Sequence, residues 1–291
     1  MKLITFIRNG NGSEEIGILK GEDSVLPLSE TRFSYRDMND LIVRASRDDL
    51  KEMGAASGRL IPVGDVRILA PIPRPLQDIL CLGMNYSDHA QEVERYSRDA
   101  FNSDRKAAVY FSKRASYCPG PGDEIPPHAG LTEKLDFENE LAVVIGRDAS
   151  DVQPEQVPSV IFGYTIVNDV SARDLQIARN QWYFGKSLEG FAPMGPCIVT
   201  SDEIAFPPRL SIKTTLNGET MQDADTSMLI HSITEIICEL SGGMTLKAGT
   251  VIATGTPKGV LMGMDEPEFM KSGDVVSCFI EGIGTLTNRV G

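Results

Sequence analysis

The sequence predicts an α+β fold that is mainly β, with a small N-terminal α/β module followed by a larger strand-rich domain. Short apolar segments bounded by turn residues recur along the chain, and helical spacing is confined to a few places. Strands do not alternate regularly with helices, which argues against a doubly wound sheet. Pro62, Pro71, Pro73 and Pro75 mark an extended connector, because proline fixes φ and removes a donor. We therefore expect a small domain over residues 1–70 and a second domain over residues 71–291.

The N-terminal module is predicted to contain two strands and one helix. Residues 2–8 and 15–20 have strand-like patterns and are joined by an Asn-Gly-Asn-Gly turn at 9–12. Residues 36–53 have apolar side chains at helical spacing.

The larger domain is predicted to consist mostly of strands. They are expected over residues 78–83, 109–113, 135–145, 160–168, 198–200, 210–216, 251–254, 275–280 and 284–287. Helices are expected over 87–96, 171–179 and 232–240, and Gly242-Gly243 stops the last one.

The composition indicates a globular protein with an acidic balance. The chain has 291 residues, 41% of them hydrophobic, and its 28 Lys and Arg against 41 Asp and Glu give a formal net charge of −13. Such a surplus repels nucleic acid and anionic lipid, so we expect neither as a partner. Small anionic substrates stay open, because a local cation reverses the local field.

The N-terminus and the cysteines predict a cytoplasmic protein. The apolar stretch at residues 1–7 is too short for a signal peptide, and no apolar run reaches the roughly 18–20 residues that span a bilayer. The 5 cysteines are far apart, odd in number and form no CxxC pair, which is typical of reduced thiols. With only 3 histidines in addition, the sequence argues against a zinc site.

Acidic residues at the start of an apolar strand are the first candidates for a site. Asp136, Glu138 and Glu140 are two residues apart and would leave a strand on one face. Like charges there need a counter-charge, for which a hard cation is the simplest; the alternative is a solvated acidic edge strand. Asp169, at a strand-to-helix junction, is either a helix N-cap or a third carboxylate ligand. Three carboxylates without a nearby Cys or His suit Mg²⁺, Mn²⁺ or Ca²⁺.

His89 and Glu92 form a second candidate pair. A helix capped by Ser87 or Asp88 would place them at i and i+3 on one face. A carboxylate beside an imidazole orients the ring and raises its basicity, so the pair could activate water. The alternative is a structural histidine near a helix start.

Two further features and one charged segment each have two interpretations. Lys186 follows Trp182-Tyr183-Phe184 and either faces a substrate as a cation or reaches solvent along its stem. The glycine-rich loop 254–260 lacks the spacing of a Walker A loop, and either holds a carboxylate on its backbone N–H groups or forms a tight turn. The charged residues 93–106 are either a solvated segment or a lid over the substrate.

Taken in this order, the segments resemble the fumarylacetoacetate hydrolase (FAH) family, in particular its bacterial acylpyruvate hydrolase and 2-hydroxyhepta-2,4-diene-1,7-dioate isomerase members. The similar segments are GMNYSDHAQE, YFSK, LDFENELAVVIG, GYTIVNDVSARDLQ, QWYFGKS, FAPMGPCIVT and ATGTPKGV. Asp-x-Glu-x-Glu followed by Asn-Asp-x-Ser-x-Arg-Asp is specific to the family.

The resemblance implies a fold, an assembly and a set of site residues. The fold is a mixed β-sandwich roll, partly barrel-like, and the assembly is a homodimer. The implied roles are a divalent ion, commonly Mg²⁺, held by Glu138, Glu140 and Asp169; a His89–Glu92 pair that takes a proton from water; Lys186 beside the reacting oxygens; and Arg173, Gln176 and Thr256 around the substrate.

The activity implied is metal-dependent hydrolysis of the C–C bond of a β-diketo acid of the acylpyruvate or fumarylpyruvate type. Water activated by His89 would attack the distal carbonyl, and Lys186 would stabilise the enolate that leaves. Decarboxylation of oxaloacetate and isomerisation of an unsaturated 2-oxo diacid are alternatives on the same site. A non-catalytic metal-binding scaffold is the alternative outside the enzymes. Arg114 and Leu188-Glu189 depart from the common family pattern, which leaves the substrate open.

Overall fold

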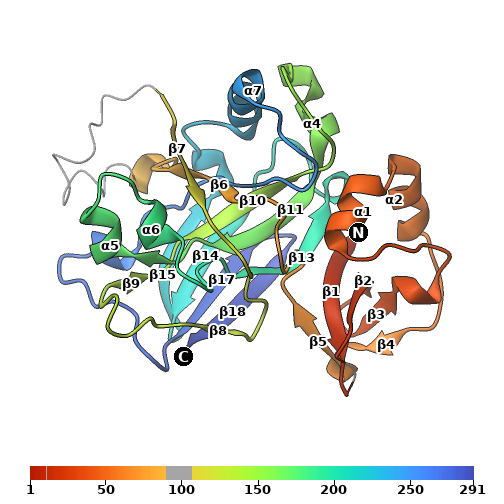
Figure 1. Cartoon of the computed structure of the whole chain (residues 1–291), viewed down its shortest axis with the longest axis horizontal. Helices are drawn as coiled ribbons and strands as arrows, with labels where there is room; N and C mark the ends of the chain where they lie inside the picture. The colour runs from red at the N-terminus through yellow and green to blue at the C-terminus, as the bar shows by residue number, and fades with distance from the viewer. Residues whose placement is uncertain (11, 90–106) are drawn as a thin grey trace.

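The computed structural model describes residues 1–10, 12–89 and 107–291, and one long mixed sheet runs through them (Figure 1). Along its main path the strands are hydrogen-bonded in the order β4 (Ile61–Pro62), β3 (Ser24–Pro27), β2 (Glu14–Lys20), β1 (Lys2–Arg8), β13 (Met194–Thr200), β11 (Ile161–Asn168), β10 (Asn139–Ile145), β16 (Val251–Ala253), β6 (Ile79–Gly83) and β7 (Val109–Lys113). β5 (Val66–Leu69) also pairs with β1. Only β16 and β6 run parallel within this described sheet.

A second sheet packs against the middle of the first. Its strands are β15 (Glu219–Asp225), β14 (Ser211–Leu216), β17 (Val275–Ile280), β18 (Gly284–Val290) and β8 (Glu124–Ile125). β14 and β17 contact β10 and β11, and β18 contacts β13. Alternate residues of β17 are buried, so one face of this sheet supplies the core between the two layers. A short ladder of β9 (Leu135–Asp136) and β12 (Ser171–Ala172) lies beside them.

The helices are short and lie around the sheets. They are α1 (Met38–Arg44), α2 (Arg47–Gly54), α4 (Val157–Val160), α5 (Arg173–Ile177), α6 (Tyr183–Lys186) and α7 (Ile233–Gly243), and residues 87–89 are also helical. α7 begins at a capping box in which Ser232 and Glu235 satisfy each other's backbone N–H groups. None of the helices in the described ranges is long and apolar enough to cross a bilayer.

The single helix predicted over residues 36–53 is wrong, because two helices occupy this stretch. Ala45 leaves the helical conformation with ψ 124, and its N–H ends α1 by donating to Leu41. Ser46 then starts α2 with a capping box to Asp49. The apolar spacing continues across the break, so periodicity alone could not reveal it.

Strand predictions need correction as well, since β3, β4 and β5 add to the two strands predicted in the N-terminal module. The strand predicted over 135–145 is interrupted, since β9 ends at Asp136 and β10 begins at Asn139, so Glu138 precedes the strand. The strand β15 was missed, because its sequence ETMQDAD is polar and shows no apolar alternation; pairing with β14 makes it a strand. The helix predicted over 87–96 lies mostly outside the described residues, as does the segment 93–106.

The mixed, mainly β fold class is confirmed, and within the described residues the sheets are open and form no barrel. The boundary at residues 70 and 71 stays a prediction. The main sheet continues across it, because β1 pairs with β13 through Lys2–Val199 and Leu3–Ile198.

Candidate metal centre and active-site pocket

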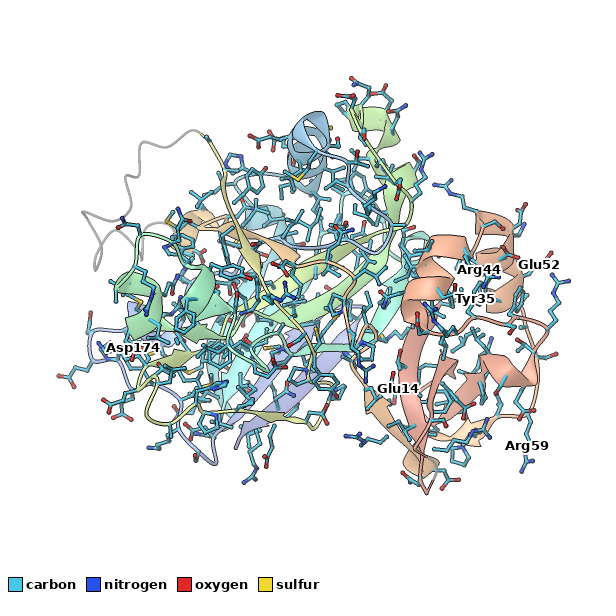
Figure 2. The ribbon with its side chains drawn as sticks, in the orientation of Figure 1. Glu14, Tyr35, Arg44, Glu52, Arg59 and Asp174 are labelled. Atoms are coloured by element: carbon cyan, nitrogen blue, oxygen red, sulfur yellow. The ribbon has the colours of Figure 1, made fainter. Side chains whose placement is uncertain are left out.

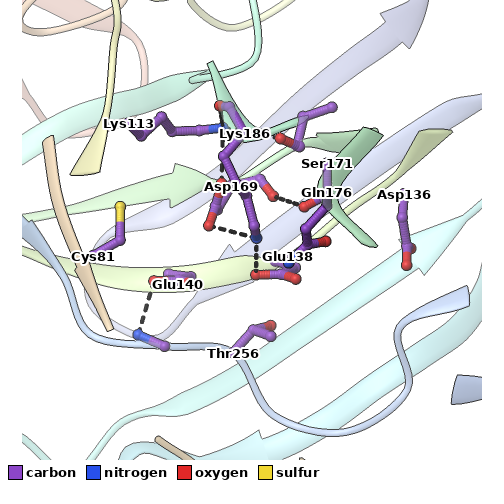
Figure 3. A network of polar contacts seen from close by, with 12 residues as sticks. Cys81, Lys113, Asp136, Glu138, Glu140, Asp169, Ser171, Gln176, Lys186 and Thr256 are labelled. Atoms are coloured by element: carbon purple, nitrogen blue, oxygen red, sulfur yellow. Dashed lines mark hydrogen bonds and ion pairs between the residues drawn. The ribbon is translucent and has the colours of Figure 1, made fainter. Parts of the chain in front are cut away.

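Three carboxylates meet where β10 begins and β11 ends. The two strands are antiparallel, with Asn139 opposite Asn168, so the residue before one strand lies beside the residue after the other. Glu138, Glu140 and Asp169 each offer an oxygen, and these oxygens lie within 4.8 Å of one another. Figure 3 shows the three side chains close together, with Lys186 joined to Glu138 and to Asp169.

The backbone around this cluster is fixed by its own hydrogen bonds. The N–H of Asp169 donates to the carbonyl of Glu138 at 2.8 Å, and the N–H of Glu138 donates to Oδ1 of Asn168 at 3.0 Å. The Ser171 hydroxyl donates to the Asp169 carbonyl at 3.0 Å. Ala172 is the N-cap of α5 and no side chain caps that helix, so the N-cap interpretation of Asp169 does not hold.

Lys186 bridges two of the carboxylates. Its Nζ lies 2.8 Å from Oε2 of Glu138 and 2.8 Å from Oδ2 of Asp169, with all three side chains buried. Burial would lower the pKa of Lys186, but the charges of Asp169 and Glu138 outweigh it and raise the pKa. The interpretation in which Lys186 reaches solvent is therefore excluded.

Lys113 is a site residue that the sequence analysis missed. It ends β7, is fully buried, and places Nζ 2.8 Å from Oδ1 of Asp169. It also donates to the carbonyl oxygens of Val170, at 2.9 Å, and of Lys186. A signal was available in the segment YFSK, since a lysine that ends an apolar strand needs an anion when it is buried.

Arg173 connects the cluster to Asp136 and Gln176. Its Nε lies 2.8 Å from Oδ2 of Asp136, and its Nη1 lies 2.6 Å from Oε1 of Glu138 and 3.0 Å from Oε1 of Gln176. Asp136 also accepts the N–H groups of Leu261 and Met262. Asp136 was expected on the same face as Glu138 and Glu140, but the break between β9 and β10 removes it from the group of possible ligands. It anchors Arg173 instead.

Glu140 is the carboxylate that the cations compensate least. Burial and the charges of Asp169 and Glu138 raise its pKa well above the ordinary value. Its Oε2 accepts the N–H of Gly255 at 2.8 Å, while its Oε1 is buried and has no hydrogen-bond partner among the described residues. Glu138 behaves differently: burial would raise its pKa, but Lys186 and Arg173 hold it at about 2.

These residues fit a divalent ion. Around the cluster, four buried carboxylates face three buried cations; they are Asp136, Glu138, Glu140 and Asp169 against Lys113, Arg173 and Lys186. The possible ligand atoms are all carboxylate oxygens, which hard cations prefer. A cation beside the orphaned Oε1 of Glu140 would satisfy it and lower the raised pKa.

The loop 254–260 serves the same cluster. Gly255 has φ +99, a conformation that favours glycine, and an added Cβ would come 2.8 Å from Cβ of Asn85. Its N–H holds the Glu140 carboxylate, so the loop does hold a carboxylate, though one of the protein's own. Thr256 accepts a hydrogen bond from Nε2 of Gln222 at 2.9 Å and is buried.

A pocket of about 40 Å³ opens beside Glu138. Its polar lining consists of His89, Glu138, Arg173, Gln176, Lys186 and Thr256. The structure therefore brings six of the predicted site residues together around one space, with Glu140 and Asp169 behind it. His89 is buried at 6% exposure, whereas Glu92 lies outside the described residues.

Comparison with known proteins agrees with this fold. The sequence profile described as Fumarylacetoacetate (FAA) hydrolase C-terminal matches residues 78–291. An oxaloacetate tautomerase of Bacillus subtilis is 44% identical over 229 residues, which cover 79% of this chain and 74% of that protein. The solved fumarylacetoacetate hydrolase of Exiguobacterium antarcticum is 38% identical, with a TM-score of 0.85 over 100% of this chain and 99% of that one. A maleylpyruvate hydrolase of Sphingobium, solved with manganese(II) and pyruvate, is 28% identical with a TM-score of 0.76, covering 100% and 98%. The chain belongs to the fumarylacetoacetate hydrolase family.

Proposed function

We propose that this protein is a divalent-metal-dependent enzyme that stabilises the enolate of a small 2-oxo acid, with oxaloacetate as the substrate and enolisation as the reaction. The observation that carries the proposal is the buried carboxylate cluster beside a pocket whose wall presents Lys186 and Arg173. The similarity to an oxaloacetate tautomerase supports the choice of reaction.

The ion would be held by Glu138, Glu140 and Asp169. Mg²⁺ and Mn²⁺ are the candidates, with Ca²⁺ also compatible with oxygen ligands; the manganese in a related hydrolase supports Mn²⁺. When bound, a divalent ion supplies Lewis acidity that polarises the carbonyl of a 2-oxo acid.

The protein's own side chains bind and orient the substrate. Lys186 presents a buried ammonium to the pocket, where negative charge grows on the enolate oxygen. Arg173 and Gln176 share a hydrogen bond and line the same wall, so they can hold the substrate carboxylate together. Thr256 also belongs to the polar lining, and its hydroxyl accepts a hydrogen bond from Gln222.

Enolisation requires only a proton to move. A proton leaves C3 of oxaloacetate and a proton arrives on the C2 oxygen, so no bond between heavy atoms breaks. His89 is the histidine of the pocket lining and is the candidate to carry this proton.

Hydrolysis of the C–C bond of an acylpyruvate is the second candidate. It is favoured by the same position of His89, since a general base in the pocket could take a proton from water. Hydroxide would add to the distal carbonyl, the C–C bond would break, and the enolate of pyruvate would leave and take up a proton. This reaction needs an activated water, whereas enolisation does not.

A substrate panel distinguishes these reactions. Oxaloacetate enolisation and decarboxylation, and the hydrolysis of acetylpyruvate and fumarylpyruvate, are followed separately with Mg²⁺, with Mn²⁺ and with EDTA. We expect oxaloacetate enolisation that EDTA abolishes and that Glu140→Gln removes, while Glu203→Gln, at an exposed acid, matches the wild type. Hydrolysis of acetylpyruvate that His89→Ala lowers by about 10²–10⁴-fold would favour the second candidate. No turnover of any substrate with either ion would reject both and favour a metal-binding scaffold.

We also propose that the protein is a cytoplasmic homodimer, as the sequence predicts. Strand-rich folds expose sheet edges that association can cover. Light scattering should then give about twice the chain mass of 31.7 kDa. A value equal to that of one chain would contradict the dimer.

A further inference from the structure

Trp182 is one of the apolar residues that line the pocket, which it shares with the cations Lys186 and Arg173. It is the one tryptophan of the chain. Its ring meets Phe111 edge-on, with centroids 5.3 Å apart and planes at 70°. The same Phe111 ring lies 5.3 Å from Nζ of Lys186, which contacts Glu138 and Asp169. The order outward from the carboxylates is therefore Lys186, Phe111, Trp182.

Gly83 makes room for the Trp182 ring. A Cβ at Gly83 would come 2.5 Å from Cζ3 and 2.8 Å from Cη2 of Trp182, closer than real Cβ contacts. The backbone of Gly83 is not among the positive-φ glycines, so the conformation does not demand glycine there. The absence of a side chain at Gly83 instead lets the indole lie against β6.

The backbone of Trp182 is held as firmly as its ring. Its carbonyl accepts the N–H of Lys186 at 3.1 Å, one helical turn along α6. Gly185 lets α6 approach α5, since a Cβ there would come 2.5 Å from the N atom of Gln176. The backbone of α6 therefore carries Trp182 at a fixed place beside Phe111 and β6.

The pocket lined by Phe111 and Trp182 is small. The pocket measures about 40 Å³, and a single water needs roughly 10–15 Å³ on the same measure. Leu82, Met84, Ile177 and Met262 complete the apolar lining. A substrate whose 2-oxo acid end lies at Lys186 would have Phe111 and Trp182, the aromatic part of this lining, available to contact its remaining carbon chain.

We infer that Trp182 sets the length of the substrate, so that the enzyme takes short 2-oxo acids, with a carboxylate or an acetyl group at C3, and rejects long or aromatic ones. This inference rests on the proposed function, because it assumes that the 2-oxo acid end lies at the carboxylate cluster. Trp182 acts as a specificity residue and takes no part in proton transfer.

The test measures binding as well as turnover. With Mg²⁺ present, calorimetry compares pyruvate with phenylpyruvate for the wild type, Trp182→Ala and Trp182→Phe. Turnover compares acetylpyruvate with its benzoyl analogue. We expect Trp182→Ala to raise the ratio of long to short substrate, in affinity and in kcat/KM, by about tenfold or more, the size typical of added room in an apolar pocket. Trp182→Phe should fall between.

Gly83 supplies a matched second variant. Gly83→Ala should push the indole into the pocket and lower the affinity for pyruvate, whereas Gly83→Ala combined with Trp182→Phe should recover most of it. Such non-additivity reports direct contact between the two positions. Thermal melting of each variant confirms that it is folded.

The outcomes separate the two proposals. If the wild type turns over no 2-oxo acid but binds pyruvate more tightly than phenylpyruvate, and Trp182→Ala removes the difference, the proposed reaction fails and the inference about Trp182 stands. An unchanged ratio in Trp182→Ala, or equal binding of both acids by the wild type, overturns the inference whatever the turnover.

Discussion

The N-terminal module and the carboxylate cluster both contain ion pairs, but the two regions place them in opposite surroundings. In the module, Arg44 pairs with Asp40 at the surface and lies 5.5 Å from the Tyr35 ring; Figure 2 shows Arg44 and Tyr35 side by side there. The side chain of Arg44 is 60% exposed. In the cluster, Lys113 and Asp169 pair with 0% exposure of either side chain.

This difference teaches what each set of charges contributes. Exposed pairs have little effect on stability, because water screens them and their side chains lose freedom on pairing. Buried pairs must first overcome the cost of leaving water, so a buried pair is weak evidence that it was retained for stability. The binding of an ion would account for these buried carboxylates better than stability does, and the three buried cations around them offset most of their negative charge.

Removing a buried cation should have the largest effect on stability. Lys113→Met leaves Oδ1 of Asp169 without its ion pair in the core. We expect the free energy of unfolding to fall by about 3–5 kcal/mol, the usual cost of breaking a buried pair from one side. Urea unfolding in EDTA measures it, with Lys213→Met as the control, since Lys213 pairs with Asp223 at an exposed position. Equal losses in the two variants would remove the distinction between the regions.

Metal binding should stabilise the protein through Glu140. At an Mg²⁺ concentration about 100 times Kd, the wild type should gain about 2.7 kcal/mol over its metal-free form. Glu140→Gln removes the carboxylate whose pKa is raised, so its metal-free form should be at least as stable as that of the wild type. The same variant should lose the gain from Mg²⁺. Thermal melts with Mg²⁺ and with EDTA measure both effects, and an undiminished gain in Glu140→Gln would exclude it as a ligand.

In the N-terminal module, the cap of helix α2 should contribute more than a surface ion pair does. Ser46 accepts the N–H of Asp49 at the start of α2, and Ser46→Ala should cost about 1 kcal/mol in unfolding free energy. Ser57→Ala, in the loop that follows the helix, serves as the control. A cost as large as that of Lys113→Met would show that the two regions do not differ as described.

A surface pair in the same module should have the smallest effect, and it should depend on pH. Arg8 donates to Glu15 at 2.6 Å and lowers the pKa of Glu15 from its ordinary value of 4.5. A lowered acid pKa stabilises the fold above pH 4.5, and this contribution is lost as the pH falls below it. Arg8→Ala should therefore cost about 0.2–1 kcal/mol at pH 7 and less at pH 3. A larger cost at pH 3 than at pH 7 would contradict the assignment.

The carboxylate cluster could be predicted from the sequence because its signal is local. Glu138 and Glu140 stand two residues apart at the start of an apolar run, and Asp169 follows another apolar run. Antiparallel pairing of two such strands brings one strand's start to the other's end. Periodicity and the family resemblance together were therefore enough.

The buried partners of the cluster and the position of Trp182 in the pocket could not be predicted in the same way, because they depend on contacts between distant segments. Lys113 reaches Asp169 only because β7 lies at the end of the sheet beside β6. Asp136 is separated from the cluster by a two-residue break that no apolar pattern marks. Gly83 and Trp182 are about a hundred residues apart, and only the close approach of the Trp182 ring to Gly83 in the folded chain relates them.

The pairing of β1 with β13 has a consequence for any attempt to isolate the larger domain. Removal of residues 1–70 would strip five strands, β1 to β5, from the sheet and leave β13 with unpaired N–H and C=O groups where β1 now pairs with it. Such an edge is a template for aggregation. In the intact chain the sheet ends instead at β4, which is two residues long and includes Pro62, a residue with no N–H to offer another strand. The N-terminal module thus ends this side of the sheet with a strand that offers few backbone groups for pairing with another chain.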